Sequence, residues 1–224
     1  MHTVVFASGE VPPESPELRR RLDEADFVIA ADGGLRHSAR LGIRADLLVG
    51  DLDSAPPDLV TVAEHVGTEV VDFPEEKDET DLELALTIAV ERGATSVNVL
   101  GLFGGRVDHE IANLALIAAP RWSAAGCRLW ADDGHRSVWV VHDELRLRLA
   151  PGTTLSLVPW GADALGVRSS GVRWPLDGAT LPAGTPRGVS NVAVGSVQYV
   201  SVDDGLLLVV VDRSEAQPPL SGGR

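Results

Sequence analysis

The chain has 224 residues, enough for one large domain or for a medium and a small domain that share an interface. Its 44% hydrophobic and 23% charged residues are typical of a globular protein and exclude a disordered chain. The net charge of −14 argues against broad contact with nucleic acid, because binding many phosphates needs clustered lysine and arginine.

The first half of the chain alternates short β-branched segments with helix-like segments. Strands are predicted at 3–8, 27–32, 46–51, 69–73 and 96–101. This alternation predicts βαβ units and a doubly wound, mostly parallel sheet, so the fold class is α/β. We expect this domain to span residues 1–130.

From about Cys127 onward the pattern changes to short strands without helices between them. These strands are predicted at 127–131, 137–143, 144–150, 154–160, 196–202 and 205–212. The pattern predicts a C-terminal antiparallel β-sandwich over residues 131–213, with the boundary between Ala119 and Val140. The segment 214–224 is rich in proline, glycine and serine and is predicted to be a disordered tail.

No segment has the length of a membrane span. The longest aliphatic run, Leu206–Val211, is far shorter than the roughly 20 residues that cross a bilayer, and the first ten residues resemble a strand more than a signal peptide. Cys127 is the only cysteine, which excludes an intramolecular disulfide and favours a reducing compartment. We therefore expect a cytoplasmic protein with no membrane segment.

Asp32 follows the second predicted strand, in the segment Ala-Asp-Gly-Gly at 31–34. Open parallel sheets bind ligands at the carboxyl ends of their strands, so Asp32 lies where a site would be. The same four residues also suit a turn in which the aspartate caps the next helix. Taken alone, this motif favours the turn.

Asp51 and Asp53 follow the third predicted strand, in Gly-Asp-Leu-Asp-Ser at 50–54. Two carboxylates two residues apart at a strand end can converge on one Mg²⁺, which binds oxygen ligands from a few carboxylates and from substrate phosphates. The alternative is an acidic loop before a helix that begins at the two prolines 56–57. That alternative explains one aspartate better than it explains two.

Lys77 and Asp81 bound the segment Lys-Asp-Glu-Thr-Asp, which opens a predicted helix. Thr80 and Glu83 fit a capping box, and Asp81 suits the positive end of the helix dipole. Capping requires neither Lys77 nor Asp78. Because Lys77 is the only lysine of the chain, it indicates a local need for an ammonium, and such a helix start can bind a phosphate with its metal.

The segment Gly101–Asn113 predicts a strand end, a glycine-rich turn and a helix. Glycines let backbone N–H groups approach phosphate oxygens, and Arg106 can add a bidentate contact. Asp108 is the expected N-cap, and His109 and Asn113 lie on one face of the helix. His109 alone fits a helix-face residue better than a metal ligand.

These four motifs follow successive predicted strands, and their order and content resemble those of thiamine pyrophosphokinases. The resemblance continues at Gly-Val-Arg-Trp-Pro-Leu (171–176) and Gly-Val-Ser-Asn (188–191), where that family recognises thiamine. It implies that Mg²⁺ and ATP serve to transfer a pyrophosphoryl group to the hydroxyethyl oxygen of thiamine, which gives thiamine diphosphate and AMP. Such transfer depends on positioning and on charge stabilisation, which agrees with the acidic and basic motifs.

The resemblance also assigns roles to individual residues. The metal ligands are Asp51, Asp53 and Asp81, and the catalytic set adds Asp32, Lys77 and Arg106. The ATP-binding residues are Ser54, Asp78, Thr80, Gly104, Gly105, Arg106, Asp108 and Asn113. The thiamine-binding residues are Trp174, Ser190 and Asn191, since a cationic ring suits an aromatic face. A homodimer with two composite sites is implied, in which the C-terminal domain of one subunit faces the catalytic domain of its partner.

Several alternatives stay open. Trp174 also fits a tryptophan of the sandwich core, and the Ser-Asn motif lacks the acidic residue that often follows it in the family. The general base is unassigned, because several aspartates could accept the alcohol proton. A related pyrophosphokinase that acts on a hydroxymethylpterin would keep the carboxylates and lose the thiamine motifs. A non-catalytic binding or scaffold protein would be expected to lose some of the acidic residues.

Overall fold

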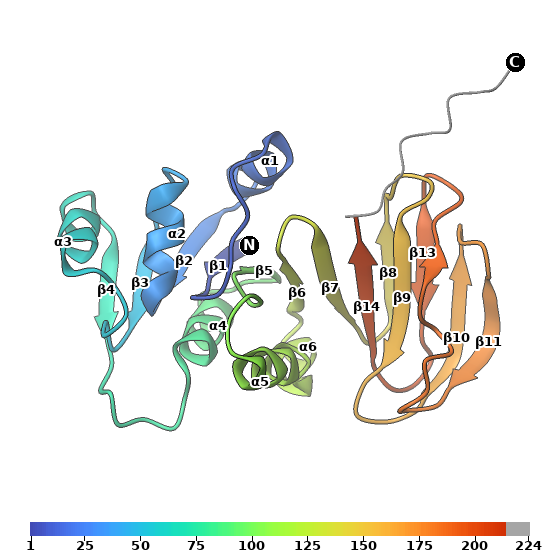
Figure 1. Ribbon diagram of the computed structural model, residues 1–224. Helices are drawn as coiled ribbons and strands as arrows, with labels where there is room; N and C mark the ends of the chain where they lie inside the picture. The colour runs from blue at the N-terminus through green and yellow to red at the C-terminus, as the bar shows by residue number, and fades with distance from the viewer. Residues whose placement is uncertain (214–224) are drawn as a thin grey trace, which may run out of the picture. The chain divides into compact units, whose positions relative to one another are not determined.

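The computed structural model describes residues 1–213, and the tail predicted at 214–224 lies outside them. The described chain forms two compact units, Met1–Gly134 and a second one that begins at His135 (Figure 1). The first is an α/β unit and the second an antiparallel β unit, so the predicted fold class is confirmed.

The first unit is built on a parallel sheet in the order β6-β5-β1-β2-β3-β4. Its strands are β1 (His2–Phe6), β2 (Phe27–Ala31), β3 (Leu47–Gly50), β4 (Glu69–Asp72), β5 (Ser96–Leu100) and β6 (Arg128–Asp132). All pairs of neighbours within this set run parallel. The strand order reverses between β1 and β5, and ligands of such sheets bind at this point of reversal.

The segment at 127–131 is placed differently from its prediction. We expect it to open the antiparallel half, but β6 pairs parallel with β5, and Leu129 lies opposite Val97. The reason is a helical crossover between the two strands, made by α5 (Val107–Ile117) and the short α6 (Pro120–Ala124). The sequence pattern did not predict α6, because five residues are too few for a helical period to be recognised.

Helices cover both faces of the parallel sheet. They are α1 (Pro16–Asp23), a 3₁₀ turn η1 (Asp32–Gly34), α2 (Leu35–Arg40), α3 (Pro57–His65) and α4 (Asp81–Glu91), followed by α5 and α6. Apolar residues of α1, α2 and α3 join one buried cluster with β1, β2 and β3. Helix α4 packs against the same strands through Leu82, Ala85, Leu86 and Ala89, a spacing that places all four on one helical face.

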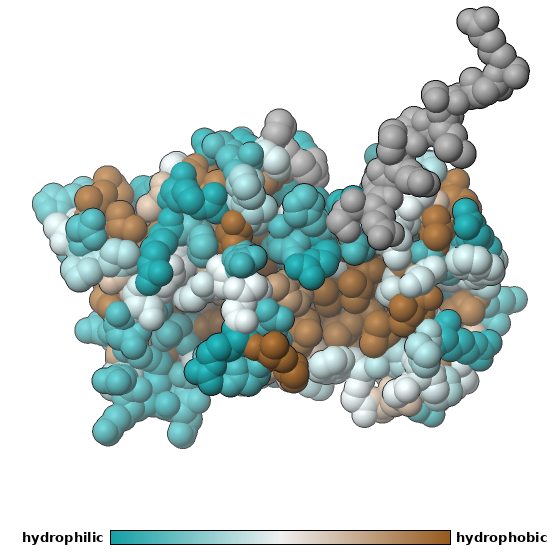
Figure 2. Space-filling model, viewed as in Figure 1, coloured by the Kyte–Doolittle hydropathy of each residue, from teal (hydrophilic) through white to brown (hydrophobic). Residues whose placement is uncertain are grey.

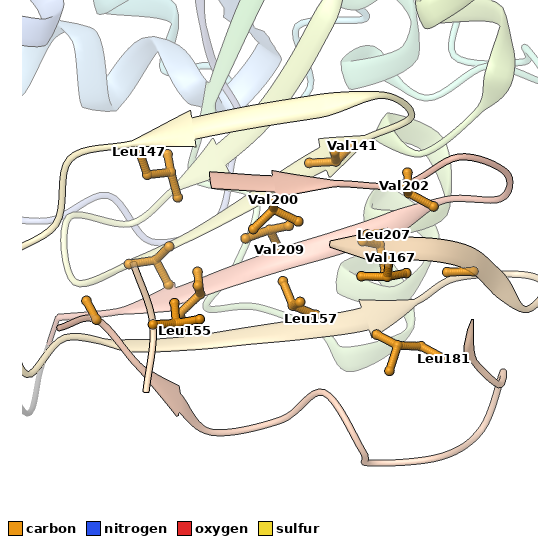
Figure 3. Close-up of a cluster of buried hydrophobic side chains, with 14 of the residues drawn as sticks. Val141, Leu147, Leu155, Leu157, Val167, Leu181, Val200, Val202, Leu207 and Val209 are labelled. Atoms are coloured by element: carbon orange, nitrogen blue, oxygen red, sulfur yellow. The ribbon is translucent and has the colours of Figure 1, made fainter. Parts of the chain in front are cut away.

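The second unit consists of two antiparallel sheets, in the orders β12-β9-β14-β7 and β11-β10-β13-β8. Its strands are β7 (Arg136–Val141), β8 (Glu144–Leu147), β9 (Thr154–Pro159), β10 (Ala164–Ser170), β11 (Leu176–Leu181), β12 (Asn191–Val192), β13 (Gln198–Ser201) and β14 (Leu207–Asp212). Side chains of both sheets meet in one core, which Figure 3 shows. Strands β10, β11 and β12 were not predicted, and β11 in particular has a single buried residue and lacks apolar alternation.

Strand β14 explains the longest aliphatic run of the chain. Leu207, Val209 and Val211 belong to the sandwich core, whereas Leu208 and Val210 point to the opposite face of the sheet. Figure 2 shows hydrophobic surface over β7 and β14. The run is therefore a strand that is apolar on both faces. Among residues 1–213, no helix combines the length and the apolar character needed to cross a bilayer.

Candidate active site

A cleft of about 470 Å³ opens in the first unit, at the carboxyl ends of its strands. It is lined by residues that follow β1, β2, β3 and β5 and by the first turns of α4 and α5. This is the region of the topological switch point. The cleft brings together ten of the predicted site residues: Asp32, Asp51, Asp53, Ser54, Lys77, Thr80, Asp81, Gly105, Arg106 and Asn113.

Three predicted nucleotide-binding residues, Asp78, Gly104 and Asp108, are not part of the cleft lining, whereas other lining residues were missed. The missed residues are Ala7, Ser8, Gly9, Ala31, Glu75, Glu79, Leu82, Gly101, Leu102, His109 and Glu110. Ala7, Ser8 and Gly9 follow β1, which borders the switch point, so this position in the sheet is a signal that could have identified them. A Cβ on Gly9 would lie 2.2 Å from the carbonyl oxygen of Phe103, so only glycine fits this close approach.

Three carboxylates form a cluster in the cleft. Oxygen atoms of Asp32, Asp51 and Asp53 all lie within 4.8 Å of one another. Asp32 has a φ of +42° and its Oδ1 accepts hydrogen bonds from the backbone N–H groups of Ser54 (3.3 Å) and Ala55 (3.0 Å). The interpretation of Asp32 as a helix cap is therefore wrong: its carboxylate binds the loop that carries the other two aspartates.

The environment of Asp32 opposes its ionisation. Its exposed fraction is only 3%, and burial raises the pKa of the carboxyl above its ordinary value of 3.8. Repulsion by Asp81 and Asp53 adds to this effect, while hydrogen bonds to the backbone of Gly33 and to Ser54 oppose it. A buried acid crowded by other acids is typical of a site that receives a cation.

Lys77 lies between two carboxylates. Its Nζ is 3.1 Å from Asp51 Oδ2 and 3.1 Å from Asp81 Oδ1, and its side chain is only 10% exposed. The interpretation of Lys77 as a solvated surface charge is therefore wrong. Burial by itself would lower the pKa of Lys77, but the contacts with Asp81 and Asp51 outweigh it, so the pKa is raised. The contact with Lys77 likewise lowers the pKa of Asp51.

Thr80 fixes the start of α4. Its side chain accepts a hydrogen bond from the N–H of Glu83 at 3.2 Å, which confirms the predicted cap. The cap places Asp81 at the first helical position, where Oδ1 is buried and accepts no hydrogen bond of normal geometry from any described residue. Asp81 is not part of the cluster of Asp32, Asp51 and Asp53, but it lines the same cleft, and its Oδ1 lies 3.1 Å from the Lys77 ammonium. A buried carboxylate oxygen paired only by charge is a type of ligand that Mg²⁺ accepts.

Gly50 explains how the aspartates of different segments approach one another. It ends β3 with a φ of +148°, and a Cβ there would lie 2.9 Å from Asp32 Cβ and 3.1 Å from Asp81 Oδ1. Any side chain would therefore push apart two of the acidic residues. Gly50 belongs to the Gly-Asp-Leu-Asp-Ser segment but is not among the predicted site residues.

The glycine-rich turn makes an unexpected contact. The N–H groups of Gly104 and Gly105 both donate to Glu110 Oε1, at 2.7 and 3.1 Å. Arg106 donates two hydrogen bonds to the carboxylate of Asp108, at 3.1 and 2.5 Å. The prediction that Asp108 is the N-cap is wrong, because α5 begins at Val107 and Arg106 occupies the cap position.

The predicted thiamine-binding residues lie in the second unit. Trp174 is 57% exposed, so the interpretation as a core tryptophan is wrong. Asn191 is buried, and its Oδ1 accepts from the N–H of Trp174 (3.1 Å) while its Nδ2 donates to the carbonyl of Trp174 (2.7 Å). The amide of Asn191 therefore holds the backbone that presents the indole ring. Ser190 has a left-handed φ of +63°, and its N–H donates to Ser156 Oγ.

Two family models match the chain. "Thiamin pyrophosphokinase, catalytic domain" matches residues 18–131, and "Thiamin pyrophosphokinase, vitamin B1 binding domain" matches residues 142–207. Among curated proteins, the chain is 25% identical to "Thiamine pyrophosphokinase" of Bacillus subtilis, over 94% of this chain and 98% of that protein. It is 26% identical to "Thiamine pyrophosphokinase 2" of Arabidopsis thaliana, over 97% and 88% of the two chains.

Solved structures have the same fold. The thiamine pyrophosphokinase of Bacillus subtilis superposes with a TM-score of 0.81 at 23% identity, covering 95% of this chain and 99% of that one. The yeast enzyme superposes with a TM-score of 0.75 at 15% identity, covering 94% and 86%. Because the catalytic-domain model matches more than half of the 224 residues, and the second model matches most of the remainder, the chain belongs to the thiamin pyrophosphokinase family.

Proposed function

We propose that this chain is a thiamine diphosphokinase that transfers a pyrophosphoryl group from Mg-ATP to the hydroxyethyl oxygen of thiamine. The bond from that oxygen to the β-phosphorus of ATP forms, the bond from the β-phosphorus to the oxygen of AMP breaks, and the alcohol proton is released. The observation that carries this proposal is the convergence of four carboxylates, one lysine and a glycine-rich turn in a single cleft of a family member.

The acidic residues of the cleft are the proposed Mg²⁺ ligands. Asp51, Asp53 and Asp81 were assigned from the resemblance, and the close approach of Asp32 to Asp51 and Asp53 supports adding it to this set. When bound, Mg²⁺ neutralises phosphate charge and orients the triphosphate. Because one oxygen of Asp32 accepts two backbone hydrogen bonds, we assign it mainly to positioning the loop that carries Asp51 and Asp53.

The cations and N–H donors of the cleft are the proposed phosphate ligands. Lys77 and Arg106 supply positive charge, and the N–H of Gly105 supplies a neutral donor. Such donors stabilise the charge that develops on the transferring group. Ser54, Thr80 and Asn113 also line the cleft and are proposed to contact the nucleotide, while Asp78 and Asp108 act from outside the lining.

The second unit is proposed to bind thiamine. The exposed indole of Trp174, over which the Arg173 guanidinium lies 5.5 Å from the ring centroid, suits a cationic heteroaromatic ring. We propose Ser190 as a polar contact and revise the role of Asn191 from direct contact to positioning. We further propose a homodimer with composite sites, to be tested by sedimentation, and a cytoplasmic location, which is supported by one buried, free Cys127.

The decisive assay measures AMP release from ATP with Mg²⁺ and a panel of alcohols. We expect thiamine to stimulate AMP release and hydroxymethylpterin to leave it at background. Stimulation by the pterin alone would favour the related pyrophosphokinase. Absence of AMP release with every alcohol, under conditions in which nucleotide binds, would favour the scaffold interpretation.

Removing the indole of Trp174 should weaken the binding of thiamine and not the binding of ATP. We expect Trp174→Ala to raise the KM for thiamine about tenfold or more and to leave the KM for ATP within about twofold, because ring binding alone is lost. Asn191→Ala should raise the KM for thiamine in the same way, since it releases the backbone of Trp174.

The two changes should not add in the double variant, because both act through one ring. Val189→Ala, at an exposed apolar residue nearby in sequence, is the matched control and should behave as the wild type. Equal increases in the KM for thiamine and for ATP would contradict the assignment.

A further inference from the structure

The ammonium of Lys77 contacts two of the carboxylates that the proposed function assigns to the metal. Nζ lies 3.1 Å from Asp51 Oδ2 and 3.1 Å from Asp81 Oδ1, and the side chain is 90% shielded from solvent. An ammonium that contacts both carboxylates neutralises much of their charge. A divalent cation therefore gains the full attraction of these two groups only when the ammonium leaves them.

The two contacts differ in how they are made. Lys77 donates a hydrogen bond to Asp51, whose other oxygen accepts from the N–H of Asp53 at 3.3 Å. Asp81 Oδ1 lies at the same 3.1 Å from Nζ, but this ion pair lacks normal hydrogen-bond geometry within residues 1–213.

Acidic groups of the chain also bind the other proposed phosphate ligands. Glu110 accepts from the N–H groups of Gly104 and Gly105, and Asp108 binds the guanidinium of Arg106. Each cation or donor assigned to phosphate therefore has a carboxylate partner already. To bind phosphate, these cations and N–H groups must leave their carboxylate partners. When Lys77 does so, it releases Asp51 and Asp81, which are proposed metal ligands.

We propose that the Lys77 ammonium is a placeholder for the metal ion, a role that rests on the proposed function. It holds the positions of Asp51 and Asp81 until Mg²⁺ and the nucleotide arrive together. The ammonium then leaves the two carboxylates and contacts the phosphates of the nucleotide, and Asp51 and Asp81 bind Mg²⁺ in its place. Binding of metal and binding of nucleotide are coupled through this exchange, so the protein binds free Mg²⁺ weakly and Mg²⁺ with ATP strongly.

The first test measures Mg²⁺ binding by titration calorimetry in the absence of nucleotide. Lys77→Met keeps an extended side chain and removes the charge, so we expect it to bind Mg²⁺ at least about tenfold more tightly than the wild type. Arg92→Met, which removes a cation paired with Glu69 at 2.8 Å outside the cleft, is the matched control and should bind Mg²⁺ as the wild type does. Equal affinities of Lys77→Met and the wild type would overturn the proposal.

The second test uses the wild type and does not depend on the folding of a variant. Because Lys77 is the only lysine, labelling with ¹⁵N-lysine gives one side-chain ammonium signal. We expect Mg²⁺ with α,β-methylene ATP, whose α–β bond does not break, to shift this signal. Mg²⁺ with AMP, which lacks the transferred phosphates, should leave it in place.

The outcomes separate this proposal from the proposed function. A signal that stays unchanged while the ATP analogue binds would overturn the exchange of partners by Lys77. Absence of AMP release by the wild type would instead contradict the proposed function, and the Mg²⁺ affinities of Lys77→Met and Arg92→Met would still decide whether the ammonium competes with the metal.

Discussion

Asp53→Asn is expected to lower the rate of thiamine-dependent AMP release at least about 100-fold and to leave the melting temperature unchanged. Asp53 is the exposed member of the carboxylate cluster, and within residues 1–213 its side chain is not in an ion pair with a cation. The amide of asparagine has nearly the same volume but carries no charge for Mg²⁺. Single-turnover rates at saturating Mg²⁺ and a thermal melt measure the two quantities.

Asp58→Asn is the matched control, because Asp58 is an acid in the first turn of α3 and is not part of the cleft lining. This variant should retain the wild-type rate. Near-normal turnover of Asp53→Asn at saturating Mg²⁺ would show that Asp53 does not bind the metal.

Asp32→Asn is expected to change activity and stability in opposite directions. The substitution removes a buried charge that Asp81 and Asp53 repel, while the amide oxygen still accepts from the N–H groups of Ser54 and Ala55. We expect the free energy of unfolding to rise by on the order of 1 kcal/mol at pH 7, and the rate of AMP release to fall at least about 100-fold.

The pH dependence of the stability difference follows from the raised pKa of Asp32. The Asp32 carboxyl binds its proton more strongly in the folded protein than in the unfolded chain. Ionisation of Asp32 therefore lowers the free energy of unfolding. This cost is fully present above the folded-state pKa and disappears as the pH falls to the ordinary value of 3.8. The stability advantage of Asp32→Asn should therefore shrink with acidification in urea titrations.

Asp46→Asn provides a contrast. Asp46 accepts from the N–H of Val28 at 2.9 Å and pairs with Arg44 at 2.8 Å, so removing its charge should lower stability. A stability loss in Asp32→Asn as large as that in Asp46→Asn would contradict the repulsion assigned to Asp32.

The parallel unit could be predicted well because β1, β2, β3 and β5 are buried along most of their length and form short apolar runs in the sequence. The five strands predicted between 3 and 101 correspond to β1–β5, and the acidic motifs at their ends line one cleft. The antiparallel half was predicted less completely. Strand β11 has only one fully buried residue and no alternation of apolar residues, and β12 has only two residues, so neither produces a hydrophobic period in the sequence.

Within the site, residue types could be predicted but their partners could not. The capping of α4 by Thr80 follows from local spacing, so the sequence predicts it correctly. By contrast, Asn191 and Trp174 are 17 residues apart in sequence and meet only because β12 forms. The contact of Lys77 with Asp51 joins segments 26 residues apart, and no local pattern encodes such a pair.

The position of β14 in its sheet has a consequence for synthesis on the ribosome. β14 pairs along its full length with β7 on one side and β9 on the other, although it follows both in the chain. Until Asp212 has left the ribosomal tunnel, β7 and β9 each lack this neighbour and expose an unpaired edge. The sandwich therefore completes its folding late, while the parallel unit, whose strands all precede residue 133, folds during translation.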